Sequence, residues 1–227
     1  MYLTLSLAGT LLLVIASILS IPVKTRITSL DLIFVGFLFI LSCIYGFSLA
    51  MKPNWIKGPS TKHTAVKAGS TSKNKVNRIR RGHHPVCSNF QNHTIQYNGK
   101  VSCAACLGLA IGCVISILLM VLYLIIFPSL SLTVFALMLS YGLIIIVFSY
   151  IETVIPQRTS TSHVASNILL VIGLFLVVAG VFGTSRNHLI GAFAVLLSFL
   201  WLDTRVQLSQ WNHEKICRDC RNSCKAY

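Results

Sequence analysis

Residues 105–127 have the sequence ACLGLAIGCVISILLMVLYLIIF, which contains no charged side chain. About 20 consecutive apolar residues in a helix are enough to cross the hydrocarbon core of a bilayer. A helix in that position also satisfies its own backbone hydrogen bonds, as the absence of water requires. The run therefore predicts a transmembrane helix and makes the chain a candidate membrane protein.

The rest of the chain repeats this pattern. Of its 227 residues, 55% are hydrophobic and 11% are charged, and the mean hydropathy is +0.76, which is outside the range of soluble domains. We predict an all-α polytopic helical membrane protein with about six transmembrane helices, at residues 2–22, 29–50, 105–127, 130–151, 164–184 and 187–203. The first segment lacks a basic start and a cleavage site, so we expect a retained helix rather than a signal peptide.

This pattern divides the chain into four parts. Residues 1–50 hold the first two predicted helices, and residues 51–104 form a basic linker followed by a Cys/His-rich loop. Residues 105–203 hold the other four helices, and residues 204–227 form a cysteine-rich tail. The chain therefore leaves little room for a soluble catalytic domain.

The Lys and Arg residues predict the orientation. Sixteen of the 19 lie in the 51–104 loop, after the fourth predicted helix, or in the tail, and three lie on the other side: Lys24, Arg26 and Arg186. Basic residues are enriched in cytoplasmic loops, so we expect both termini and the 51–104 loop in the cytoplasm, with the protein in the cell membrane. Lys24 and Arg26 alone would favour the reverse orientation of the first helix, but the larger imbalance outweighs them.

The basic residues of the loop cluster between positions 52 and 81. Residues 58–82 are polar and poor in apolar side chains, which predicts a flexible linker. Anionic lipid headgroups are compatible partners, since each basic group near such a surface contributes on the order of 1 kcal/mol. Nucleic acid binding is disfavoured, because no aromatic side chains are interleaved with the charges for base stacking.

Six of the eight cysteines lie in two polar segments that this topology places on one side. In the first segment, Cys103 and Cys106 form a C-x-x-C pair, a spacing that aims two thiolates at one ion. An Asn98-Gly99 turn precedes the pair, between the predicted short strands 93–97 and 100–103. Cys87 and His93 are the candidate additional ligands of a metal site closed within this loop.

The second segment is the tail, with His213, Cys217, Cys220 and Cys224. On a helix these four residues would form one stripe, and at 1.5 Å per residue they would extend over about 16 Å. They cannot all bind one zinc ion unless the helix breaks. Cys217 and Cys220 could instead complete a four-cysteine site with the C-x-x-C pair of the loop.

In a reducing cytoplasm, such pairs are metal ligands or redox dithiols more often than stable disulfides. Zinc is the expected metal because thiolate and imidazole ligands suit it. An iron–sulfur cluster, a redox-active pair and thiols without a joint role are the alternatives. Cys43 and Cys113 lie inside predicted helices, where we expect small packing residues.

The segment that contains Cys87, His93, Gly99 and Cys103-Ala104-Ala105-Cys106-Leu107-Gly108, leading to Gly112, resembles an uncharacterised family of small prokaryotic multi-pass membrane proteins. Its pattern is a Cys and a His, then Cys-x-x-Cys-x-Gly-x-x-x-Gly at the start of a span. The match covers about 30 residues; Cys87 and His93 are separated here, whereas the family has them adjacent. The resemblance implies a thiol-rich membrane protein and no particular reaction.

We therefore expect an integral membrane protein with a cytoplasmic-face Cys/His metal site, acting as a structural or accessory subunit of a membrane complex. One alternative is an enzyme, a membrane thiol oxidoreductase that uses C-x-x-C pairs with a quinone or a partner. Another is a transporter or channel, which the absence of a charged residue at the middle of any predicted span restricts to a small neutral permeant. We expect a structural or accessory role rather than a catalytic one.

Overall fold

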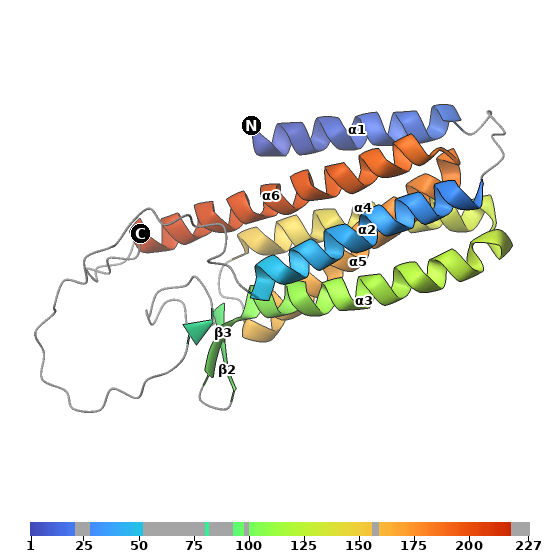
Figure 1. Cartoon of the computed structure of the whole chain (residues 1–227). Coiled ribbons are helices and arrows are strands. Elements are labelled where there is room, and N and C mark those ends of the chain that lie inside the picture. The colour runs from blue at the N-terminus through green and yellow to red at the C-terminus, as the bar shows by residue number, and fades with distance from the viewer. Residues whose placement is uncertain (21–27, 52–79, 82–92, 98–99, 156–158, 219–227) are drawn as a thin grey trace, which may run out of the picture.

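The structure is a computed structural model that describes residues 1–20, 28–51, 80–81, 93–97, 100–155 and 159–218. Within these ranges it has six long helices and three short strands (Figure 1). The helices are α1 (Tyr2–Ser20), α2 (Ser29–Met51), α3 (Ala104–Ile126), α4 (Leu132–Val154), α5 (Ser160–Ser185) and α6 (His188–Arg218). All six are long and apolar enough to cross a membrane, as the sequence predicts. A 3-10 turn, η3 (Phe127–Ser129), follows α3.

Consecutive helices run in opposite directions along the bundle. The N-terminus, the strands and the last turns of α6 consequently lie at one end, which we call the hairpin end (Figure 1). The arrangement agrees with placing these parts of the chain on one side of a membrane. That this side is the cytoplasm stays a prediction.

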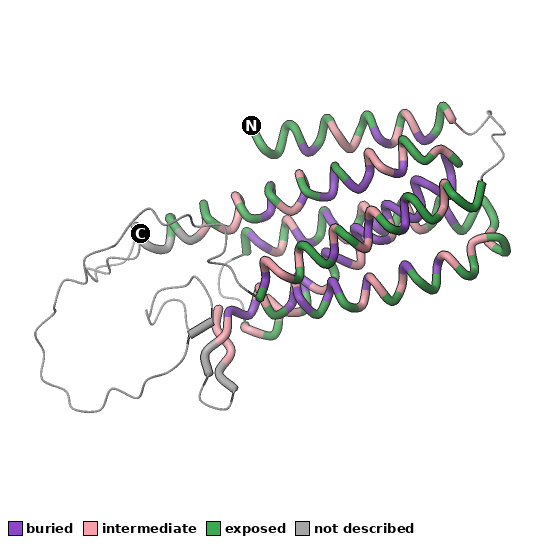
Figure 2. Tube along the Cα trace, viewed as in Figure 1, coloured by how far each residue is buried: buried purple, intermediate pink, exposed green. Residues whose placement is uncertain are grey.

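Helix α5 is the most buried element of the bundle (Figure 2). In the most apolar segment of α5, 67% of the residues are buried, whereas in the corresponding segment of α1 only 17% are buried. It packs against α3 and α4 most extensively, and also against α1 and α6. The core of the bundle is therefore built around a helix near the end of the chain.

Glycines allow α5 to approach its neighbours closely. A methyl group at Gly180 of α5 would lie 2.5 Å from the backbone nitrogen of Leu139 and 2.8 Å from the carbonyl oxygen of Phe135, both in α4. A methyl group at Gly112 of α3 would lie 3.0 Å from Cβ of Val171 in α5. Small residues at such contacts let helix backbones meet, which is a main source of helix association in lipid.

Large apolar side chains cover the outside of the bundle. Leu118 and Ile125 of α3 are 65% and 71% exposed, and Ile144 of α4 is 62% exposed. A soluble protein rarely presents such continuous apolar surface to water. These side chains have the character of a lipid-facing surface.

Helix α6 is longer than the sequence predicted. The predicted span ended at residue 203 and was followed by a tail, whereas α6 continues to Arg218. Asp203 is exposed, but Thr204 and Arg205 directly after it are buried, with 0% and 6% exposure. The helix continues past the charges at which a hydropathy average stops, because its buried face still finds partners in the bundle.

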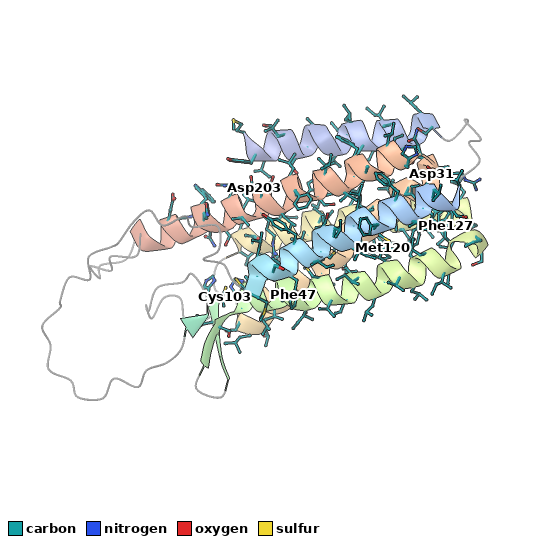
Figure 3. All side chains as sticks on the ribbon, in the orientation of Figure 1. Asp31, Phe47, Cys103, Met120, Phe127 and Asp203 are labelled. Carbon is teal, nitrogen blue, oxygen red and sulfur yellow. The ribbon has the colours of Figure 1, made fainter. Side chains whose placement is uncertain are left out.

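Polar contacts fasten the outer helices to the bundle. The Trp201 indole nitrogen of α6 donates to Oγ1 of Thr10 in α1 at 3.1 Å. The Tyr150 hydroxyl of α4 donates to the carbonyl of Trp201 at 2.9 Å. At the other end, Oδ1 of Asp31 in α2 lies 2.8 Å from Nδ1 of His188 in α6 (Figure 3). Helix α6 therefore links both outer helices to the core.

Candidate functional site

A small sheet at the hairpin end leads directly into α3. Strand β2 (Thr94–Tyr97) pairs antiparallel with β3 (Lys100–Cys103), with Thr94 opposite Cys103. This confirms the predicted hairpin to within one residue. Strand β1 (Arg80–Arg81) pairs in parallel with residues 101–102, so the predicted linker 58–82 is corrected at its end. Backbone groups of β3 bond on both edges, which explains why a polar stretch forms a strand here.

Two cysteines lie where β3 becomes α3. Cys103 is the last residue of the strand and the N-cap of the helix, and Cys106 is in the first helical turn. Figure 3 shows Cys103 at this junction, at the hairpin end of the bundle. The side chains of Cys103 and Cys106 lie next to each other, and neither forms a disulfide. The predicted C-x-x-C pair is therefore brought together.

The two thiols differ in exposure. Cys103 is 2% exposed and belongs to the core, whereas Cys106 is partly exposed. Strand β3 fixes the position of Cys103, and helix α3 fixes the position of Cys106. Ligand or reagent therefore has better access to the sulfur of Cys106.

The hairpin is held against the start of α5. Oγ of Ser160 donates to the carbonyl of Thr94 at 3.0 Å. Directly before Thr94, the ring of His93 lies over the ring of His163 in α5, with 4.3 Å between the ring centroids. His163 was not among the predicted site residues, because it lies more than sixty positions from the hairpin in the sequence. These contacts fix the hairpin, and with it the thiol pair, relative to the bundle.

The structure describes the other predicted metal ligands only in part. Cys87, Cys220 and Cys224 lie outside the described residues. His213 and Cys217 lie on the last turns of α6, and the structure describes their backbone only. Within the described ranges, no group of three or more His, Cys, Asp or Glu side chains is placed to hold a metal ion. Of the predicted cysteine ligands, the structure describes the side chains of Cys103 and Cys106.

A pair of adjacent thiols can do two kinds of chemistry. As thiolates they can supply two of the four ligands of a tetrahedral zinc site. As thiols they can close to a disulfide and release two electrons and two protons.

A buried arginine was not predicted. Arg205 of α6 donates from Nε to Oγ1 of Thr153 at 3.2 Å and from Nη2 to Oγ of Ser166 at 2.6 Å. Its Nη1 donates to Oδ1 of Asn167. The sequence placed Arg205 in the tail, although it follows Trp201 by four residues and so shares the buried face of α6. That spacing was the one signal available.

A second pair of cysteines also meets. Cys43 of α2 and Cys113 of α3 are buried, and their side chains lie next to each other. The sequence predicted separate packing residues at these two positions. They are packed in the core as predicted, but they pack against each other. No sequence pattern connects them, because they lie on different helices.

Comparison of the chain with family models, with curated proteins and with solved structures finds no match. The function must therefore be argued from the residues and their geometry. The family resemblance of the Cys103–Gly112 segment stays a prediction.

Proposed function

We propose that the protein is a multi-pass membrane protein whose hairpin end carries a thiolate metal site, with zinc as the metal, and that it acts as a structural or accessory subunit of a membrane complex. One observation carries the proposal: Cys103 and Cys106 are held side by side where the hairpin joins α3. The six apolar helices support the membrane location.

The geometry suits a structural metal site. Cys103 is fixed by strand pairing and Cys106 by the helix, so the two sulfurs are oriented before a metal binds. The Ser160 and His163 contacts hold the same hairpin against α5. A preorganised pair loses little conformational freedom on metal binding, which favours affinity.

Further ligands come from the segments nearest the pair. His93 precedes β2, and Cys87 lies upstream of it in the sequence. The tail cysteines Cys217, Cys220 and Cys224 are the other candidates, since α6 ends at the hairpin end of the bundle (Figure 1). The basic residues of the chain favour a cytoplasmic location for this end, and reducing conditions there keep thiols available for metal.

Elemental analysis of the detergent-purified full chain tests the proposal. We expect zinc close to one or two ions per chain in the wild type, and its loss in the Cys103→Ser/Cys106→Ser variant. A matched control is Cys43→Ser/Cys113→Ser, which removes two thiols away from the hairpin and should retain the metal. A wild-type protein without metal, or equal metal in both double variants, would refute the proposal.

A second candidate function is a membrane thiol oxidoreductase. The observation that favours it is the placement of Cys103 at the N-cap and Cys106 in the first turn of α3, with Cys106 partly exposed. The pair would transfer two electrons and two protons to a disulfide of a partner protein and become a disulfide itself. Metal-free protein that cycles between these two forms, with the cycle abolished by Cys106→Ser, would establish this function instead.

A further inference from the structure

A pair of thiols lies inside the bundle, between α2 and α3. Cys43 and Cys113 are 5% and 3% exposed, and their side chains lie next to each other where α2 packs on α3. A methyl group at Gly46, one turn after Cys43, would lie 3.4 Å from Sγ of Cys113, so Cys113 lies against this turn of α2. The packing of α2 on α3 therefore brings two sulfurs from distant parts of the sequence into contact.

This inner pair is separate from the pair at the hairpin end. Cys113 follows Cys106 by seven residues, which is about 10 Å along a helix at 1.5 Å per residue. A disulfide bond is only about 2 Å long, so the two pairs cannot exchange sulfur partners without a large movement of α3. An inference about the inner pair therefore does not rest on the proposed metal site.

The surroundings of the inner pair select between metal and redox chemistry. A metal ion requires deprotonated thiolates, and placing charge in an apolar interior is costly. A disulfide carries no charge and leaves no polar hydrogen to be satisfied. Oxidation is the change that this environment accommodates.

The environment also selects the oxidant. Phe47, labelled in Figure 3, follows Cys43 by one turn and is 37% exposed. Val114, next to Cys113, is 47% exposed. These side chains are part of the apolar outer surface of the bundle, so a reagent dissolved in lipid approaches the pair more readily than one dissolved in water.

We propose that Cys43 and Cys113 form an intramembrane redox site that is oxidised to a disulfide by a lipid-soluble quinone. Both S–H bonds break and one S–S bond forms between the two sulfurs. The two electrons and two protons pass to the quinone, which becomes the hydroquinone. The product fastens α2 to α3.

The test uses the full chain in lipid vesicles, as a variant in which the six other cysteines are replaced by serine, so that the inner pair can be followed alone. The vesicles receive a short-chain quinone with every ring position substituted, which can oxidise thiols but cannot add to them. After unfolding, remaining thiols are alkylated and the peptides are analysed by mass spectrometry. We expect a peptide that joins Cys43 to Cys113, reversed by a dithiol reductant, and one hydroquinone formed for each pair.

Two controls make the result decisive. The further change Cys43→Ser should abolish hydroquinone formation, while circular dichroism reports that the helices remain folded. Dihydrolipoamide in the same vesicles confirms that the quinone is active. If dihydrolipoamide is oxidised while Cys43 and Cys113 remain fully alkylated, the inner pair is a packing contact only and the proposal is overturned.

Discussion

Replacing Gly180 by alanine should separate α5 from α4. The new methyl group would lie 2.5 Å and 2.8 Å from backbone atoms of Leu139 and Phe135, and backbone atoms cannot rotate away as side chains do. Overpacking a close contact costs about 1–3 kcal/mol, and two backbone clashes place this site at the upper end. Alanine regains about 1 kcal/mol of helix propensity relative to glycine. We therefore expect a net loss of about 2 kcal/mol in the free energy of unfolding.

Gly46→Ala is the matched control, since its methyl group would meet Sγ of Cys113 at an ordinary 3.4 Å. It should be neutral or more stable by up to about 1 kcal/mol, because only the propensity gain applies. Both variants are measured in detergent micelles by denaturation with sodium dodecyl sulfate, followed by circular dichroism. If Gly180→Ala is as stable as Gly46→Ala, the close contact of α4 and α5 does not determine stability, and the reasoning is refuted.

Three further changes test other contacts. Arg205→Met should reduce the free energy of unfolding by about 3 kcal/mol, because three buried partners each lose a hydrogen bond worth about 1 kcal/mol; stability equal to wild type in the same denaturation assay would contradict it. Tyr123→Phe should cost about 1 kcal/mol in that assay, since its buried hydroxyl donates to the carbonyl of Ala179 at 3.0 Å, and an unchanged midpoint would count against that bond. Ser160→Ala removes the bond to the carbonyl of Thr94, so amide hydrogen exchange in the hairpin should accelerate while that of α5 stays the same; equal acceleration in both would indicate general unfolding.

The sequence predicted the elements that local rules determine. The hairpin was predicted because an Asn98-Gly99 turn lies between short stretches suited to strands. The helices were predicted because long apolar runs have few alternatives in a bilayer. The C-x-x-C pair was predicted as a unit because Cys103 and Cys106 are close in the sequence, and their contact needs only the strand-to-helix junction.

Contacts between helices were not predicted. Hydropathy averages over all faces of a helix, so it could not show that Arg205 faces three polar side chains on α4 and α5. The contact of Cys43 with Cys113 depends on the rotation of two separate helices about their axes, which no single segment encodes. His163 meets His93 only because the hairpin folds back on α5. These tertiary placements required the structure.

The central position of α5 has a consequence for biogenesis. Helix α1 packs on α5 and α6, and α4 packs most extensively on α5, so these surfaces lack their partners until the last third of the chain has been synthesised. At roughly 10 residues per second, about 14 s separate the end of α1 from the first residues of α5 at the ribosome. During that interval the early helices must wait in the membrane as separate segments. A translocon or insertase that covers the α5-facing surfaces of these early helices over that period would prevent the helices from pairing with other nascent proteins.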